Sequence, residues 1–148
     1  DPTATRKLFE VGVEVVRVGF DSRFDSQNYM ETGVAMPHAS SLSINGEVAR
    51  NFSKHIFAAG HYTDTADISK SICLGATAVE ISEMFYGHEE SYGRTETIDG
   101  KMYKNNTEYN GQIINTTIDM QRQLIKSCQL AGYKTLKSFR DSASIIII

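Results

Sequence analysis

Histidine and carboxylate side chains are the residues of this sequence whose types best suit metal binding. They follow the predicted strands, at His61 and in the consecutive run His88, Glu89 and Glu90. Imidazole and carboxylate groups bind zinc and related ions, but zinc sites place their ligands at short, regular spacings. Because no two of these side chains have the spacing of ligands on one helix, we expect no metal site.

The two cysteines, Cys73 and Cys128, lie far apart in the sequence, and both fall in helical patterns. Paired, they would form a single disulfide, but reduced and buried thiols are typical of a cytosolic protein. We therefore expect free thiols and a cytoplasmic location. Because the sequence has no signal-peptide pattern and no initiating methionine, we expect a fragment, a processed product or an altered version of a longer protein.

Segments with two kinds of periodicity must position these side chains. Helical patterns cover 2–11, 44–52, 64–74, 113–131 and 136–142, and strand patterns cover 13–18, 55–59 and 78–82. Each predicted strand runs into a loop and then a helix, which is typical of a parallel sheet covered by helices. This order predicts the α/β fold class.

Other segments depart from that alternation. Residues 95–104 hold Asp99 and Gly100 between two extended arms, which predicts a hairpin with a primed turn. The polar stretch 21–36 is expected to be a functional loop or a disordered segment, and the four isoleucines at 145–148 a final strand or a core-filling tail. Three parallel strands cannot close a barrel, so other strands must complete it or the sheet edges stay open.

Composition excludes several classes of function. A chain of 148 residues has room for one domain with a core, so we expect a single domain over 1–148. The net charge is −3 and the sequence pI is about 5.8, with scattered Lys and Arg, which argues against nucleic-acid binding. No apolar run approaches the roughly 20 residues of a membrane span, so we expect no membrane partner.

Five short motifs follow one another in a specific order. They are Val-Arg-Val-Gly at 16–19, Thr-Gly-Val-x-x-Pro at 32–37, Ile-Phe-Ala-Ala-Gly at 56–60, Leu-Gly-Ala-x-Ala-Val at 74–79 and Gly-His-Glu-Glu-Ser at 87–91. Together with Gly93, Arg94 and the closing run from Asn115 to Lys137, this order resembles the IMP dehydrogenase and GMP reductase family, and its GMP reductase branch most closely. The resemblance covers essentially the whole chain, with a segment missing after Lys104.

The resemblance implies part of a TIM (β/α)8 barrel, its C-terminal half, with a shortened flap or hairpin region at 94–112 and C-terminal helices. It also implies a purine nucleoside monophosphate, GMP or IMP, at the C-terminal ends of the strands, where such barrels place their sites. Family members use a cysteine nucleophile and a nicotinamide cofactor, and GMP reductases use NADPH to convert GMP to IMP and ammonia. A homo-oligomer, a tetramer in the family, or association with the missing barrel half is implied as well.

The resemblance places Ser26 at the position of the family's catalytic cysteine and Asn28 at that of an assisting threonine. The glycines of the family's loop are also replaced. A serine hydroxyl without an adjacent base is a far poorer nucleophile than a thiol. We therefore expect catalysis to be impaired or absent.

The next two strand ends are altered too. By the resemblance, Ala59, Gly60 and His61 replace a ribose-binding Asp-Gly-Gly, and Ser82 and Glu83 replace phosphate-binding glycines. Alanine cannot accept the ribose hydrogen bonds, and the Glu83 carboxylate would bring negative charge towards a dianion. A protonated His61 could offset part of that charge.

One run of residues borders the base and cofactor region in the family: Gly87, His88, Glu89, Glu90 and Ser91. Its retention favours residual nucleotide binding. The alternative is that Gly87 and Gly93 simply preserve a turn. Most of the family's mobile flap is absent between Tyr103 and Gly111.

Two functions from different classes remain open on the sequence. The first is a GMP reductase-like purine nucleotide oxidoreductase, NADPH-dependent by resemblance, that is impaired or inactive in this chain. The second is a non-catalytic nucleotide-binding or assembly module that pairs with a full-length homologue. A degenerate sequence without a selected function is a third interpretation.

Overall fold

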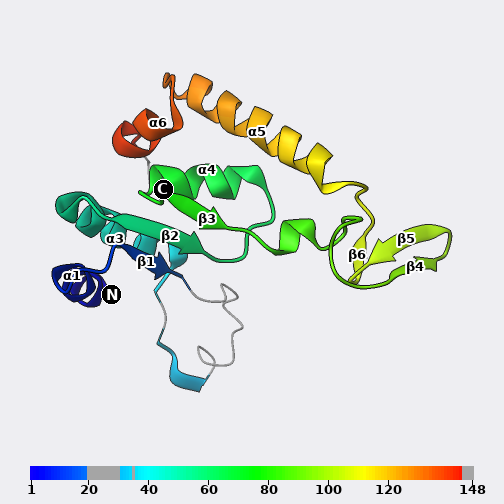
Figure 1. The fold of residues 1–148 in the computed structure, drawn as a ribbon, viewed down its shortest axis with the longest axis horizontal. Coiled ribbons are helices and arrows are strands. Elements are labelled where there is room, and N and C mark those ends of the chain that lie inside the picture. The colour runs from blue at the N-terminus through cyan, green and yellow to red at the C-terminus, as the bar shows by residue number, and fades with distance from the viewer. Residues whose placement is uncertain (20–30, 35, 145–148) are drawn as a thin grey trace.

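The computed structural model describes residues 1–19, 31–34 and 36–144 (Figure 1). Its parallel sheet has the strand order β1-β2-β3, with β1 (Val15–Val18), β2 (His55–Ala59) and β3 (Ala78–Glu80). The helices are α1 (Pro2–Glu10), α3 (His38–Phe52), α4 (Thr65–Cys73), the 3-10 helix η1 (Glu83–Phe85), α5 (Ile113–Leu130) and α6 (Leu136–Ser142). An antiparallel sheet holds β4 (Thr95–Ile98), β5 (Lys101–Lys104) and β6 (Thr107–Glu108).

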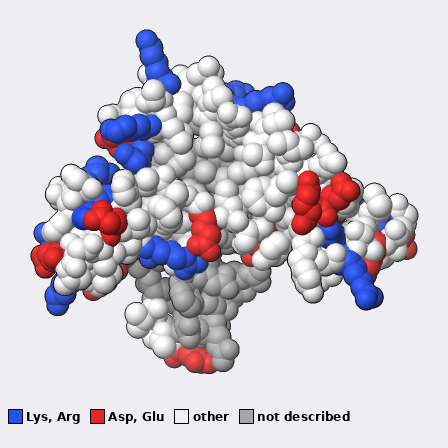
Figure 2. Space-filling model, in the orientation of Figure 1, with Lys and Arg blue, Asp and Glu red and all other residues white. Residues whose placement is uncertain are grey.

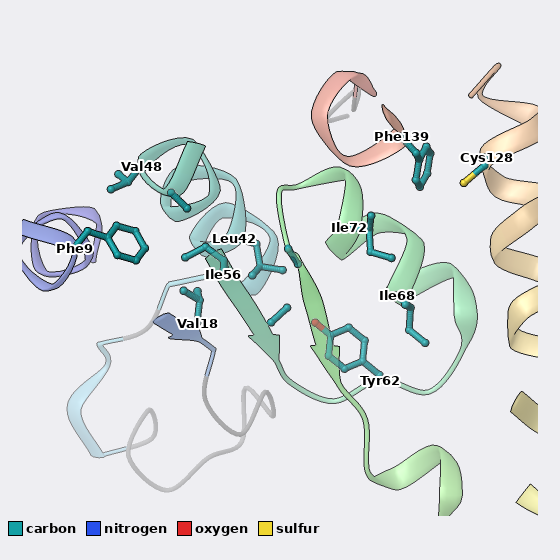
Figure 3. Packing of buried hydrophobic residues seen from close by; sticks show 13 residues of the cluster. Phe9, Val18, Leu42, Val48, Ile56, Tyr62, Ile68, Ile72, Cys128 and Phe139 are labelled. Atoms are coloured by element: carbon teal, nitrogen blue, oxygen red, sulfur yellow. The ribbon is translucent and has the colours of Figure 1, made fainter. Parts of the chain in front are cut away.

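The parallel sheet confirms the α/β class and is compatible with part of a barrel. Val16 pairs with Ile56, and Ala58 pairs with Val79, so these side chains share one face of the sheet. Ile56 and Ala58 are fully buried in the core cluster with residues of α3 and α4, as Figure 3 shows for Ile56 and its neighbours. Phe57, which points to the other face, is 43% exposed.

Helix α3 begins at His38, earlier than the predicted start at 44. Its first turns are rich in serine and lack a strong apolar period, but Leu42 is only 1% exposed and shares a helix face with Gly46 and Ala49. A Cβ atom at Gly46 would lie 2.4 Å from the carbonyl oxygen of Leu74. Glycine at this position therefore allows α3 to pack closely against the end of α4.

A buried polar contact joins α1 to α3. The Thr5 hydroxyl donates to Oδ1 of Asn45 at 2.6 Å, and Nδ2 of Asn45 donates to the Ser41 carbonyl at 2.8 Å. Both Thr5 and Asn45 are almost completely buried, so this pairing satisfies groups that would otherwise be costly to bury. The rings of Phe9 and Phe52 pack beside it, with centroids 5.9 Å apart.

The predicted hairpin is confirmed with its bounds, and Figure 1 shows it projecting from the parallel sheet beyond η1. Asp99 and Gly100 have φ values of 50° and 78°, as a primed turn requires. The short third strand, β6, was not predicted, because two residues are too few to show a period.

Helices α5 and α6 pack against α4 on the outer side of the sheet (Figure 1). Cys128 on α5 is buried beside Phe139 of α6 (Figure 3), and Cys73 and Cys128 are both free thiols, as predicted. Burial raises the pKa of the Cys73 thiol. Among the described residues, no helix is both long enough and apolar enough to cross a membrane.

Candidate functional site

The C-terminal ends of β1, β2 and β3 meet at one edge of the sheet because the three strands are parallel. Gly19 ends β1 with a φ of 109°, and a Cβ atom there would lie 1.9 Å from the Ala59 carbonyl oxygen and 2.7 Å from Cε1 of His38. A residue with a side chain does not fit this place. Gly19 thus brings the ends of β1 and β2 and the start of α3 together.

His61 and Glu83, expected beside a phosphate, bind each other in the structure. Nδ1 of His61 contacts Oε2 of Glu83, and the two side chains are 38% and 25% exposed. The pair joins the loop after β2 to η1 at the edge where the strands end. The contact satisfies one hydrogen-bonding atom of each side chain within the protein.

The remaining residues expected at this edge have mainly backbone roles. Gly60 follows β2 directly, next to His61. Ser82 precedes η1, and its carbonyl oxygen accepts a hydrogen bond from the Phe85 amide at 3.0 Å. Ser26 and Asn28, expected at the nucleophile, lie outside the described residues.

An ion pair that was not predicted lies across the same sheet. Nε and Nη2 of Arg17 bind the two carboxylate oxygens of Glu80 at 2.7 and 3.2 Å. The hydrogen bonds lower the pKa of the Glu80 carboxyl and raise that of the Arg17 guanidinium. The sequence carried a signal for it, since each predicted strand is mainly apolar and the two hold charged residues of opposite sign, Arg17 and Glu80.

Tyr62 anchors the loop after β2 through its hydroxyl. The hydroxyl lies 3.0 Å from Nε2 of His38 and 3.0 Å from Oγ of Ser71, and Tyr62 is only 3% exposed. Burial raises the pKa of Tyr62, and burial also lowers the pKa of His38. The uncharged forms of both side chains are therefore favoured, which suits a structural link between α3 and α4.

The run 87–91 forms the turn that joins η1 to the hairpin and to α5. The Asn110 amide donates to the Gly87 carbonyl, and the Glu89 amide donates to the Gly111 carbonyl, both at 2.8 Å. A Cβ atom at Gly87 would lie 2.3 Å from the Glu108 carbonyl oxygen. These contacts favour the interpretation in which glycine preserves a turn.

The side chains of this turn also bind within the protein. Oγ of Ser91 lies 2.7 Å from the carbonyl oxygens of both Tyr86 and His88, which share its single donor proton. Oε2 of Glu90 accepts the Ile113 amide at 2.9 Å, which caps the start of α5 and lowers the pKa of the Glu90 carboxyl. Glu89 holds Lys104 through its backbone carbonyl, which accepts from Nζ.

His88 is the most deeply buried side chain of this turn, at 1% exposure. Its Nε2 lies 2.7 Å from Oγ1 of Thr116 on α5, and its ring stacks edge-on to Phe85 with centroids 5.7 Å apart. Its Nδ1 is buried with no hydrogen-bond partner among the described residues. His88 also lines a cavity of about 620 Å³ between the loop after β2, η1 and the start of α5.

The sequence motifs placed His61 and Glu83 after neighbouring strands, and in the structure both lie at the edge of the sheet where these strands end. The motifs gave no sign that His88 is buried, because its neighbours Gly87 and Glu89 are small or polar. No group of three or more histidine, cysteine or acidic side chains within the described ranges could hold a metal ion.

Residues 1–111 match the family model of the IMP dehydrogenase / GMP reductase domain. This chain belongs to the IMP dehydrogenase / GMP reductase family. Two similar curated proteins are the GMP reductases of Staphylococcus saprophyticus, 31% identical, and of Clostridium acetobutylicum, 30% identical. Each match covers 99% of this chain and 51% of the relative.

The chain thus spans about half the length of the family members that it matches. The match to the Staphylococcus saprophyticus protein runs over 169 residues, which is longer than the 148 residues of this chain. Part of the matched segment of that family member therefore has no counterpart here.

Proposed function

We propose that this chain is a GMP reductase-like half of a TIM barrel in which the purine nucleotide chemistry is impaired or lost. By resemblance, that chemistry is the NADPH-dependent conversion of GMP to IMP. The direct contact between the side chains of His61 and Glu83 carries this proposal. A phosphate dianion at the strand ends would meet a carboxylate, and the imidazole that could offset it is already bound to that carboxylate.

The nucleophile position supports the same proposal. Reduction of GMP in the family needs a thiolate that adds to the purine ring, and this chain has the hydroxyl of Ser26 at that position by resemblance. An unactivated hydroxyl has a pKa far above that of a thiol, so it supplies almost no anionic nucleophile at neutral pH.

The described residues near the strand ends do not fit NADPH well either. Dinucleotide phosphates favour the N-termini of helices, where free amides and the helix dipole attract anions. The carboxylate of Asp64 caps α4, accepting the Asp67 amide at 2.9 Å, and Glu90 caps α5 in the same way. We propose that binding of the cofactor is impaired together with the chemistry.

Calorimetric titration with GMP and IMP, with and without NADPH, tests this proposal alongside an assay of NADPH oxidation by the full chain. No turnover and no binding at millimolar nucleotide are the expected results. Ser26→Cys restores the thiol and is expected to remain inactive, because the ribose and phosphate contacts are altered as well. Measurable GMP-dependent NADPH oxidation by the unaltered chain would contradict the proposal.

A second candidate function is an assembly module that pairs with a full-length homologue. The face of the sheet that carries Phe57 supports it, because Val15 and Phe57 are 38% and 43% exposed there. Large apolar side chains on a sheet face normally pack against another layer. α5 adds three further exposed side chains at 39–52%: Ile114, Ile118 and Ile125.

Co-expression with an intact barrel homologue tests this second candidate. Co-purification at a fixed ratio, lost in Phe57→Ser but kept in the exposed loop variant Tyr92→Ser, is the expected result, since Tyr92 is 96% exposed and lies on the hairpin side. A chain that remains monomeric and shows no association at micromolar concentration would contradict it.

A further inference from the structure

Two asparagines of this chain are followed directly by glycine: Asn45 precedes Gly46, and Asn110 precedes Gly111. Asparagine is one of the chemically labile residue types of proteins. In an asparagine–glycine pair, the backbone nitrogen of the glycine can attack the side-chain amide carbon of the asparagine, because glycine has no Cβ atom to hinder the approach. Whether the attack occurs in the folded protein depends on what holds the two groups of each pair.

The fold protects the pair in α3. Asn45 is 1% exposed, its Oδ1 accepts from the Thr5 hydroxyl at 2.6 Å, and its Nδ2 donates to the Ser41 carbonyl at 2.8 Å. Both residues of the pair lie inside the helix, where backbone amides donate to carbonyls one turn earlier. Attack by the Gly46 nitrogen would therefore require α3 to unwind and its buried contact with α1 to break.

The pair between β6 and α5 is open by comparison. Asn110 and Gly111 belong to no helix or strand of the described structure, and Asn110 is exposed. Among the described residues, neither the side-chain amide of Asn110 nor the backbone amide of Gly111 has a hydrogen-bond partner. A Cβ atom at Gly111 would meet no other group within 4 Å, so the space around this glycine is open. The two reacting groups are therefore adjacent, exposed and free of competing hydrogen bonds.

We propose that Asn110 is a deamidation site whose reacting partner is the backbone nitrogen of Gly111. The Gly111 nitrogen forms a bond to Cγ of Asn110 and gives up its proton, and the side-chain nitrogen leaves as ammonia. Water then adds to one of the two carbonyl carbons of the resulting succinimide ring and breaks the bond between that carbon and the ring nitrogen. Opening at Cγ leaves aspartate. Opening at the backbone carbonyl carbon leaves isoaspartate, whose main chain runs through Cγ.

Isoaspartate at position 110 disturbs the attachment of the turn 87–91. The Asn110 amide donates to the Gly87 carbonyl, and the Gly111 carbonyl accepts from the Glu89 amide, both at 2.8 Å. Isoaspartate adds a methylene carbon to the main chain between these two hydrogen bonds, so their spacing no longer matches that of their partners in the turn. The modification therefore loosens the contact between this turn and the segment that leads into α5.

Both products also add a negative charge to a side of the molecule that already carries several. Figure 2 shows acidic side chains close together at the right of the view, on the side where Figure 1 places the hairpin. Glu89 belongs to the turn that Asn110 contacts, and Glu108 lies two residues before Asn110. Salt screens the repulsion between like charges, so the loosening is expected to be larger at low ionic strength.

Incubation of the full chain in mildly alkaline buffer, followed by peptide mapping with mass spectrometry, tests the site. Conversion at Asn110 is expected to be at least tenfold faster than conversion at Asn45 in the folded chain, and similar at the two positions when urea unfolds the chain. Equal or slower conversion at Asn110 in the folded chain would overturn the proposal. A tenfold difference that persists in urea would also overturn it, because the fold would then not be the cause. Neither nucleotide nor cofactor takes part, so the outcome is independent of the proposed function.

A matched pair of variants tests the assignment through the release of ammonia. Asn110→Gln keeps an amide but lengthens the side chain, so the ring that must close is larger, and ammonia release is expected to fall at least fivefold. Asn115→Gln is the control, because Asn115 is exposed on α5 and is followed by threonine rather than glycine. It is expected to release ammonia at the rate of the unaltered chain. Equal rates in the two variants would overturn the assignment to Asn110.

Amide hydrogen exchange tests the structural consequence. The Glu89 amide is expected to lose protection at least tenfold in the incubated chain that contains isoaspartate. It is expected to keep its protection in fresh Asn110→Asp, which carries the charge without the added main-chain carbon, and in incubated Asn110→Gln. Unchanged protection in the isoaspartate form would overturn the proposed effect on the turn, and so would an equal loss in either variant.

Discussion

Arg17 on β1 and Glu80 on β3 form two hydrogen bonds with each other across β2, the strand that lies between them. The side chain of Arg17 shares a sheet face with Phe57, its partner in the β1–β2 register. The pair therefore fixes the two outer strands relative to each other on the face that carries exposed apolar side chains.

Glu80→Gln is expected to lower the free energy of unfolding slightly at neutral pH, because both side chains of the pair are more than half exposed and solvent screens them. The pKa of Glu80 is lowered in the folded state. Its carboxylate therefore adds to the free energy of unfolding at pH values above the pKa of Glu80 in the unfolded chain. That contribution is lost as the pH falls through the folded pKa. Urea unfolding of both proteins between about pH 7 and about pH 3 should show a difference that disappears in acid. A difference that is independent of both pH and salt would contradict this account.

Gly46→Ala is expected to destabilise the protein by about 1–3 kcal/mol, the usual cost of overpacking a close contact. Helix propensity alone would favour alanine by about 1 kcal/mol, but the new Cβ would lie 2.4 Å from the Leu74 carbonyl oxygen. Ser40→Ala in the exposed part of α3 is the control, because it changes propensity without a clash. Thermal unfolding of the two variants should give shifts in opposite directions. An increase in stability for both would show that α3 can move away from α4.

Tyr62→Phe is expected to cost about 1–3 kcal/mol of stability, because it leaves the polar groups of His38 and Ser71 without their shared partner. The hydroxyl of Tyr62 lies 3.0 Å from each of them, and the residue is 3% exposed. Tyr92→Phe removes the same hydroxyl from a 96% exposed position and should have almost no effect. Chemical unfolding of both variants measures the difference, and equal stabilities would contradict the structural role of the Tyr62 hydroxyl.

His38 is expected to make stability depend on pH near neutrality. Burial lowers its pKa in the folded state below the ordinary value of 6.5, so the unfolded chain takes up the proton first. The neutral form of His38 contributes its full share to the free energy of unfolding at pH values above the pKa of His38 in the unfolded chain. This share is lost as the pH falls from that pKa to the pKa in the folded state. His38→Gln cannot titrate, so its unfolding midpoint should fall less steeply than that of the unaltered chain between about pH 7 and about pH 5. Parallel pH profiles would show that the other histidines dominate.

Local chemistry in the sequence determined most of the secondary structure. Asp64 caps α4, Gly132 follows the last turn of α5, and Asp99 with Gly100 forms the primed turn of the hairpin. Each of these signals acts between residues a few positions apart, so it can be read without the tertiary structure. The alternation of strands and helices likewise determined the α/β class and the parallel sheet.

Contacts between distant residues were decided by the tertiary structure alone. Arg17 and Glu80 meet because of the register of three strands, and His61 meets Glu83 because two loops end at the same edge. His88 is buried because α5 returns across the turn that holds it and brings Thr116 within 2.7 Å. The sequence could name these residues as candidates, but whether their side chains bind a ligand or one another depends on packing that no local pattern encodes.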